Sequence, residues 1–204
     1  MEESADCREY TIKVSFFEIL NEKIFDLLKT MKVPLALKEA GAEFYIPDLK
    51  CAAVATEDEA ITLLEHGCKT RATGATAQNA HRHAILMDCQ CSSINQSINH
   101  YSFEFPASSR SHAVFRIALA HSDPETGETA ESRISLVDLA GSESNAASAE
   151  FSAERRQEGV NINKGLSVLN RCIAAICNKE KYIPFRDSVL TKVRLLNTSV
   201  YFFL

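Results

Sequence analysis

Hydrophobic and polar residues alternate along several stretches of the chain, and each stretch predicts a β-strand. Residues 10–20 alternate in this way and predict a half-buried strand. Residues 113–119 predict a second strand, and the Asp-Pro-Glu-Thr-Gly string at 123–127 predicts a turn into a largely buried strand over 131–139. Residues 33–49 hold β-type residues around an Ala-Gly-Ala string, which predicts a small hairpin.

Helical patterns mark other stretches. Thr56 and Glu59 form a capping box, in which a hydroxyl and a carboxylate bind free N–H groups of the first turn. The helix that follows is expected to end near Gly67, which suits a left-handed stop. Hydrophobic residues recur every three or four positions from 162 to 176 and predict a helix packed along one stripe. Residues 23–28 are expected to form a short helix.

The composition fits one globular domain, or most of one. The chain has 204 residues, of which 46% are hydrophobic, and a formal net charge of −5. This apolar content supplies a substantial core, and the negative charge argues against general nucleic-acid binding. No run is apolar for long enough to cross a membrane, and the acidic residues 1–6 are not a secretory signal. Seven scattered cysteines favour reduced thiols over a disulfide framework.

Two strings carry the candidate chemistry. Ser-Ser-Arg-Ser-His occupies 108–112, and Asp-Leu-Ala-Gly-Ser-Glu occupies 138–143 at the end of a predicted strand. An isolated Asp-x-x-Gly favours a strand-end cap, but the two strings together offer the hydroxyls, backbone N–H and charge pair that phosphoryl transfer needs. A glycine-rich loop ending in Gly-Lys-Ser or Gly-Lys-Thr does not occur, and the nearest string, 67–70, has cysteine before its lysine.

These two strings and three others, in the same order, resemble the kinesin motor domain family. The five matching segments are 14–28, 108–112, 138–143, 158–166 and 183–191. In the family, the second and third segments are switch I and switch II, the fourth opens the relay helix, and the last faces the microtubule. The resemblance implies an α/β fold: a three-layer motor core of the P-loop NTPase type, with a mixed central sheet flanked by helices. The first and last segments hint at the transporter-like subfamily (kinesin-3-like).

The resemblance also implies roles for the switch residues, with ATP and Mg²⁺ as cofactors. Ser109 is expected to coordinate Mg²⁺ or orient the attacking water, and Asp138 is expected to hold the Mg²⁺ shell through water. Arg110 and Glu143 are expected to form an ion pair that closes only with nucleotide bound, so the expected catalytic residues are Ser109, Arg110 and Glu143. The expected nucleotide-binding residues are Ser108, Ser111, Asp138, Gly141 and Asn163.

Microtubule binding is expected to use lysine and arginine, because the tubulin surface is acidic. The expected contacts are Lys164, Lys181, Arg186 and Lys192. Without the family, solvated lysines at helix ends and loops are the better explanation of such residues. Two positions depart from the family: Val189 stands where lysine is frequent, and Gly165 replaces the usual serine, which costs about 1 kcal/mol inside a helix.

Residues 82–107 interrupt the switch I region, where the family runs directly from an Asn-x-x string into Ser-Ser-Arg-Ser-His. The segment has no clear period and no turn chemistry, and its removal restores the motif. We therefore expect translated non-coding sequence or an error in the predicted gene, with a regulatory loop extension as the alternative. A metal site of His81, His83, Cys89 and Cys91 is the weakest reading, because Cys-x-Cys is poor spacing for zinc.

The domain layout follows from these matches. Residues 1–9 are an extension, 10–194 a partial kinesin motor domain, and 195–204 a divergent apolar tail. The phosphate loop and the outer strands and helices of the family are expected to be missing, so we expect poor solubility and no ATP hydrolysis. The implied function is ATP-driven movement along microtubules in the cytoplasm. The alternative is a nucleotide-independent microtubule-binding or regulatory module.

Overall fold

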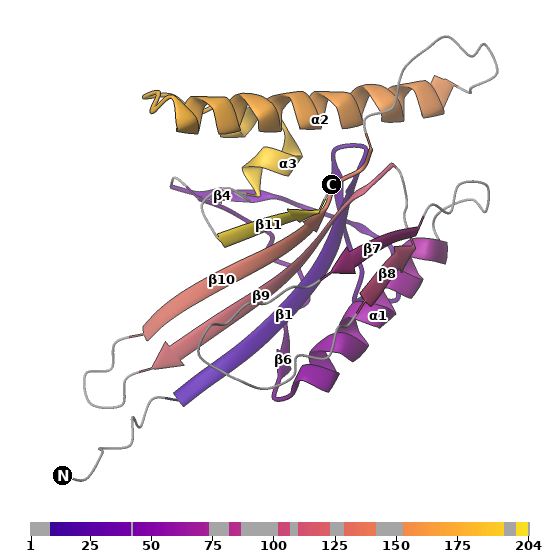
Figure 1. Cartoon of the computed structure of the whole chain (residues 1–204), viewed down its shortest axis with the longest axis vertical. Helices are drawn as coiled ribbons and strands as arrows, with labels where there is room; N and C mark the ends of the chain where they lie inside the picture. The colour runs from indigo at the N-terminus through magenta and orange to yellow at the C-terminus, as the bar shows by residue number, and fades with distance from the viewer. Residues whose placement is uncertain are drawn as a thin grey trace.

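A mixed β-sheet forms the centre of the computed structural model (Figure 1). The structure describes residues 9–41, 43–73, 82–86, 102–106, 110–122, 129–141, 153–193 and 199–203. Within these residues the sheet has seven strands in the order β11-β10-β9-β1-β2-β3, with β6 also paired to β1. Only the β10–β11 pair of this sheet is parallel among the described strands. The strand bounds are β1 Glu9–Leu20, β2 Lys23–Asp26, β3 Pro34–Leu35, β6 Ala52–Val54, β9 His112–Ser122, β10 Thr129–Asp138 and β11 Ser199–Phe203.

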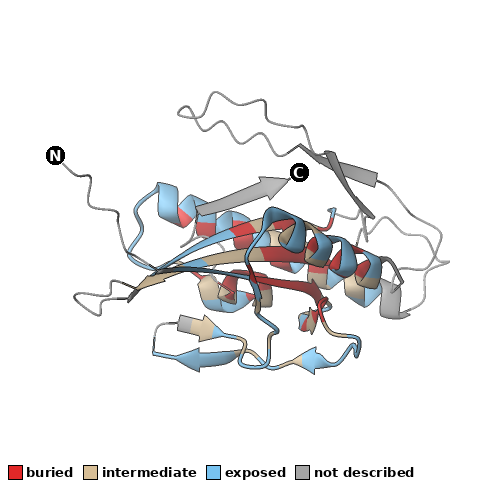
Figure 2. Ribbon diagram, turned by 90° about the horizontal axis from the view of Figure 1, so that it is seen from below, coloured by how far each residue is buried: buried red, intermediate tan, exposed pale blue. Residues whose placement is uncertain are grey.

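The three long strands confirm the strands predicted from the sequence, but the middle of β1 is not half-buried as predicted. In β1, β9 and β10 the register places Phe16 opposite Phe115, and Phe115 opposite Leu136. Their side chains therefore share one face of the sheet. Phe16 and its neighbour Phe17 are both fully buried, which means that the middle of β1 is covered on both faces and not only on one. Figure 2 shows the buried residues gathered along the middle of the sheet.

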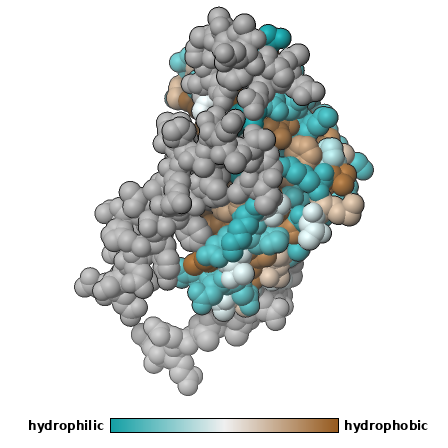
Figure 3. Space-filling view, turned by 90° about the vertical axis from the view of Figure 1, so that its right-hand side faces the viewer, coloured by the Kyte–Doolittle hydropathy of each residue, from teal (hydrophilic) through white to brown (hydrophobic). Residues whose placement is uncertain are grey.

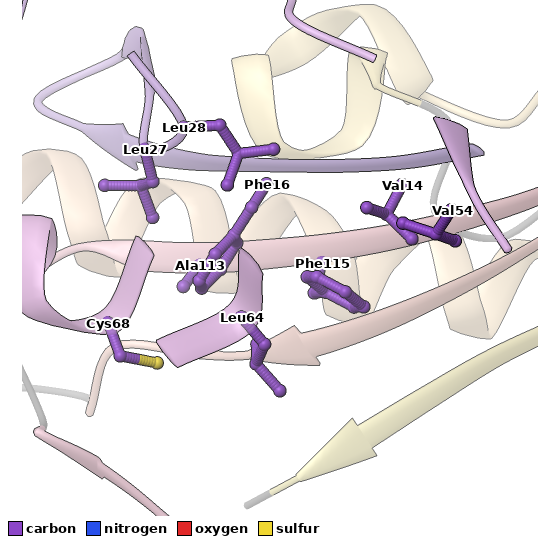
Figure 4. Close-up of a cluster of buried hydrophobic side chains, with 9 residues drawn as sticks. All are labelled: Val14, Phe16, Leu27, Leu28, Val54, Leu64, Cys68, Ala113 and Phe115. Carbon is purple, nitrogen blue, oxygen red and sulfur yellow. The ribbon is translucent and has the colours of Figure 1, made fainter. Parts of the chain in front are cut away.

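Helix α1 (Glu57–Thr73) covers one face. Its first turn has the predicted capping box: the Glu59 N–H donates to Thr56 Oγ1 at 3.3 Å, and the Ala55 N–H donates to Glu59 Oε2 at 2.7 Å. Below the helix lies a cluster of buried side chains drawn in Figure 4, which contains Val14, Phe16, Leu27, Leu28, Val54, Leu64, Cys68, Ala113 and Phe115. The cap fixes where the helix starts, and the cluster fixes which side faces the sheet.

The prediction that this helix ends near Gly67 is wrong, because α1 continues to Thr73. Gly67 lies inside the helix, where a Cβ atom would come within 2.1 Å of Phe16 Cδ1. The glycine is therefore explained by the close approach of the helix backbone to the Phe16 ring and not by a turn.

The opposite face is covered by helix α2 (Ala153–Cys177), the short 3₁₀ turn η1 (Phe185–Asp187) and helix α3 (Val189–Lys192). A second buried cluster on this face includes Phe17, Val114, Val137, Leu169 and Leu190. Helices thus lie on both sides of the sheet, which confirms the three-layer α/β fold (Figure 1). The predicted stripe of α2 is correct at Ile162 and Leu169, but Ile173 and Ile176 are partly exposed.

Residues 23–28 do not form the predicted helix. Asn21 and Glu22 both have positive φ, 52° and 58°, and this two-residue turn sends the chain back along β1 as strand β2. Asp26 ends the strand, and its carboxylate accepts hydrogen bonds from the N–H groups of Leu28 (2.8 Å) and Lys50 (2.7 Å). The positive φ angles at 21–22 therefore determine that a paired strand follows, and not a helix.

Two short hairpins lie outside the main sheet. Strands β4 (Lys38–Ala40) and β5 (Glu43–Tyr45) pair around Gly41, whose φ is +61°, and confirm the hairpin predicted within 33–49. Strands β7 (Arg82–Leu86) and β8 (Ser102–Pro106) pair antiparallel within the segment 82–107, for which no pattern was predicted. Of the described helices, none is long and apolar enough to cross a membrane. On the side of the molecule shown in Figure 3, hydrophilic residues lie between the hydrophobic ones.

Candidate functional site

Side chains from three elements meet where β10 ends. Arg71, near the end of α1, is 1% exposed, and its Nη1 donates to Asp138 Oδ2 at 2.6 Å. Asp138 is the last residue of β10. The same guanidinium donates from Nε to Ser111 Oγ at 3.3 Å and from Nη2 to the Ser111 carbonyl oxygen at 2.7 Å. One arginine therefore links α1, the end of β10 and the start of β9.

The burial of this ion pair determines its energetic role. Each charge loses its hydration when it is buried, so the Coulomb attraction offsets a desolvation penalty and the intact pair adds little net stability. Removal of one partner leaves an uncompensated buried charge and costs about 3–5 kcal/mol. The Arg71–Asp138 pair therefore acts as a positional lock, because it forms only while the three elements keep their relative positions.

His112 makes a second connection at the same place. The buried imidazole accepts a hydrogen bond at Nδ1 from the Ala140 N–H at 3.0 Å, just after β10. Burial, with a further contribution from the Arg71 charge, lowers the pKa of His112 to about 4. The ring is therefore neutral at pH 7. Its Nδ1 atom must carry no proton, because it accepts the hydrogen bond from Ala140. Its Nε2 points to Gly165 of α2, where a Cβ atom would lie 3.7 Å away.

Arg110, just before β9, connects this region to helix α2. Its Nη1 lies 2.8 Å from Glu158 Oε2 on α2, and the two side chains are 28% and 25% exposed. The predicted partner, Glu143, lies outside the described residues, so that ion pair stays a prediction. Arg110, Ser111 and His112 thus contact α2, α1 and the end of β10 in turn.

The other predicted nucleotide-binding residues are placed unequally. Gly141 is exposed, and a Cβ atom there would meet no described residue within 4 Å. Asn163 is half-buried on α2. Ser108 and Ser109 lie outside the described residues. The structure therefore brings Ser111 and Asp138 together through Arg71 and leaves the direct role of each residue as a prediction.

The predicted microtubule contacts share one side of the molecule. Lys164 lies on α2, Lys181 in the loop that follows, Arg186 on η1 and Lys192 on α3, and these elements pack against one another. Lys164, Lys181 and Arg186 are exposed, and Lys192 is half-buried. They carry positive charge over the α2 face of the sheet, opposite α1.

Arg186 is engaged within the chain. Its guanidinium forms an ion pair with Glu39 on β4 and lies 5.9 Å from the centroid of the Phe44 ring on β5. The next residue, Asp187, pairs with Arg171 on α2. These contacts join the β4–β5 hairpin, η1 and α2 at one corner of the molecule.

Comparison with known proteins decides the family. A family model described as the kinesin motor domain matches residues 1–100 and 95–200. The chain belongs to the kinesin motor domain family. The two matches overlap at residues 95–100, inside the segment 82–107.

Three kinesins show how much of the family's length is present. Kinesin-like protein 3 of Schizosaccharomyces pombe is 34% identical over 193 residues, which is 94% of this chain and 30% of that protein. Kinesin-like protein KIF13B of Homo sapiens is 35% identical over 197 residues, 90% of this chain and 9% of that protein. The structure of a fast kinesin, described with its ATPase mechanism and microtubule interactions, matches with a TM-score of 0.72 at 29% identity, covering 98% of this chain and 50% of that one. The chain therefore spans half or less of the kinesins it matches.

Sequence reasoning missed two residues of this kinesin site. Arg71 directly follows the 67–70 string that resembles a phosphate loop, and only its burial and its ion pair reveal it. Glu158 was part of the relay-helix segment but had no role assigned. A single arginine or glutamate on a helix has no periodic signal, so the tertiary contact was needed to find each partner.

The fit of this kinesin site to Mg²⁺ and a triphosphate is partial. Asp138 and Ser111 both bind the Arg71 guanidinium where β10 ends, and Gly141 beyond them is exposed. However, the Asp138 carboxylate is neutralised by Arg71, and no cluster of three metal-ligating side chains occurs among the described residues. The phosphate-cradling string is absent from the sequence. We therefore assign no hydrolytic step to these residues.

Proposed function

We propose that these 204 residues form the phosphate-sensing and microtubule-facing part of a kinesin motor that moves along microtubules with ATP. The connection of Arg110, Ser111 and His112 to three different elements carries the proposal. A loop that touches α1, the end of β10 and α2 is suited to convert a small change at a phosphate into a shift of α2.

Each switch residue keeps one proposed task. Ser108, Ser111, Asp138, Gly141 and Asn163 contact the nucleotide, and Ser109, Arg110 and Glu143 act at the transferring phosphoryl group. Mg²⁺ bound with the triphosphate supplies charge neutralisation at that group. The Oδ2 atom of Asp138 is available to the metal shell only when the Arg71 guanidinium shares or releases it, because Arg71 Nη1 lies 2.6 Å from this oxygen.

The cationic face supports microtubule binding and hence a place on the microtubule cytoskeleton. Lys164, Lys181, Arg186 and Lys192 all lie on packed elements of one face, which an acidic surface would meet together. Exposed cations contribute chiefly to association rate and salt dependence. Binding is therefore expected to weaken as ionic strength rises.

A second function is favoured by a specific contrast within the chain. The cations proposed to contact the microtubule are all present, whereas the string that cradles phosphate is not. The chain by itself would then bind microtubules without responding to nucleotide.

Co-sedimentation with microtubules separates the two functions. The purified chain is spun with microtubules in the absence of nucleotide, with ADP and with a non-hydrolysable ATP analogue. Equal binding under the three conditions supports the nucleotide-independent module, and binding that changes with nucleotide supports a complete sensing site. Failure to sediment with microtubules under every condition would contradict both.

A further inference from the structure

Arg186 contacts the β4–β5 hairpin in two ways, through an ion pair and through an aromatic ring. The hairpin supplies both a carboxylate, Glu39 on β4, and an aromatic ring, Phe44 on β5, to one guanidinium on η1. Glu39 and Arg186 are separated by 147 residues in the chain. The pairing is therefore a tertiary contact between two elements and not a local one within a helix or turn.

The ion pair is accessible to solvent. The Arg186 side chain is 64% exposed and that of Glu39 is 41% exposed. Ion pairs of this kind are weak, because water and salt compete with them. A second carboxylate from a partner surface can therefore displace Glu39 at small cost, while the ring face of Phe44 continues to hold the guanidinium.

The two sides of the contact are anchored differently. On the η1 side, Asp187 pairs with Arg171 of α2, and Thr191 Oγ1 donates to the Phe185 carbonyl oxygen at 2.9 Å. Ser188 Oγ accepts from the Thr191 N–H at 3.2 Å and caps α3. On the hairpin side, all three residues of β4 are exposed. Arg186 therefore starts from a fixed backbone, and Glu39 is the partner that can leave.

We propose that Glu39 is a built-in competitor for Arg186: it occupies the guanidinium in the free protein, and an acidic microtubule surface takes its place on binding. This proposal rests on the proposed function, because it assumes that the partner of Arg186 is the microtubule. Glu39 then lowers the affinity of the face and prevents Arg186 from pairing with scattered acidic groups. Removal of the Glu39 charge tightens binding, and the gain depends on Arg186.

The test is a double-mutant cycle measured with two probes, microtubules in co-sedimentation and poly-L-glutamate in a binding titration. Four versions of the 204-residue chain are compared: the unmodified protein, Glu39→Gln, Arg186→Ala and the double variant. Glu39→Gln is expected to tighten binding to both probes by about two- to fivefold, the range of a surface ion pair. The same change in the Arg186→Ala background is expected to have no effect. Thermal unfolding followed by circular dichroism checks that every variant is folded.

A matched control removes one negative charge from the other face of the sheet. Glu65→Gln on α1 changes the net charge equally but lies on the helix opposite η1, so it is expected to leave both affinities unchanged. An equal gain in affinity from Glu65→Gln would contradict the proposal that Glu39 competes for Arg186. A gain from Glu39→Gln that persists without Arg186 would contradict it as well. If Glu39→Gln tightens only poly-L-glutamate and no chain binds microtubules, the competitor stands and the proposed function fails.

Discussion

The two helices that cover the sheet each contain an interior glycine, and the two glycines differ in their surroundings. At Gly67 of α1 a Cβ atom would lie 2.1 Å from the Phe16 ring, so the helix backbone rests directly on the sheet. At Gly165 of α2 the nearest atoms, on His112 and Leu190, lie 3.7 Å from the same position. Helix α1 is therefore locked against the sheet, and α2 retains space.

This difference fits the proposed function if α2 shifts against the sheet while α1 stays fixed to it. Arg71 fastens the end of α1 to Asp138 through a buried ion pair. On the other side, α2 meets residues 110–112 through the partly exposed Arg110–Glu158 pair and the His112 ring. The contacts of α2 are those that can be remade, because the pair is solvent-accessible and the glycine leaves a gap.

The largest effect is expected from loss of the lock on the α1 side. Arg71→Met leaves Asp138 buried without a partner and is expected to lower the free energy of unfolding by about 3–5 kcal/mol, measured by urea denaturation. Arg171→Met, which breaks the exposed pair with Asp187, is the matched control and is expected to cost less than about 1 kcal/mol. Equal losses from the two variants would contradict the lock.

The next effect concerns pH on the α2 side. The pKa of His112 is lowered from 6.5 to about 4 in the folded protein, so the unfolded state takes up the proton first as pH falls. The stabilisation that neutral His112 provides is complete above pH 6.5 and is lost progressively toward pH 4, by up to about 3 kcal/mol. Urea denaturation at intervals between pH 7 and pH 5 measures the slope.

A His112→Gln variant isolates this contribution. The variant is expected to lose most of the pH dependence of the free energy of unfolding between pH 7 and pH 5. His66→Gln, at an exposed position of α1, is expected to keep it. If His112→Gln shows the same fall in stability as the unmodified protein, the neutral buried ring is not its cause.

The two glycines test the comparison most directly. Gly67→Ala forces the new methyl group into the Phe16 ring and is expected to lower the melting temperature, with a loss of about 1–3 kcal/mol. Gly165→Ala, at an interior position of α2, serves as its control.

Gly165→Ala is expected to have the smallest effect and the opposite sign. The methyl group meets only ordinary contacts at 3.7 Å, and alanine restricts the unfolded chain and favours the helix, so a gain of about 0.5–1 kcal/mol is expected. Thermal unfolding of both glycine variants in the same buffer compares the two changes in stability. A destabilisation at Gly165 as large as that at Gly67 would mean that α2 is packed as closely as α1.

Much of the fold could be predicted from local patterns, because the long strands, the start of α1 and the existence of α2 all have clear signals in the sequence. The patterns failed where a tertiary contact decided the outcome. Gly67 is a suitable helix stop by local rules, but the approach to Phe16 gives it another reason to be glycine. The positive φ angles of Asn21 and Glu22 turned a predicted helix into strand β2.

The candidate site divides in the same way. Ser111, Asp138 and Arg110 were found because they belong to strings whose order carries information. Arg71 and Glu158, which hold Asp138 and Arg110, stand 67 and 48 residues away from their partners in the chain. No spacing rule connects positions so far apart, and only the folded arrangement of α1, β10 and α2 brings them together.

The central claim is that the α2 face meets the microtubule while the α1 face does not. Hydrogen–deuterium exchange of the chain, followed by mass spectrometry with and without microtubules, tests this claim across both faces in one experiment. The account predicts slower exchange in the β4–β5 hairpin and from α2 through α3, with exchange along α1 unchanged. Slower exchange in α1 with no change in α2, η1 and α3 would contradict it.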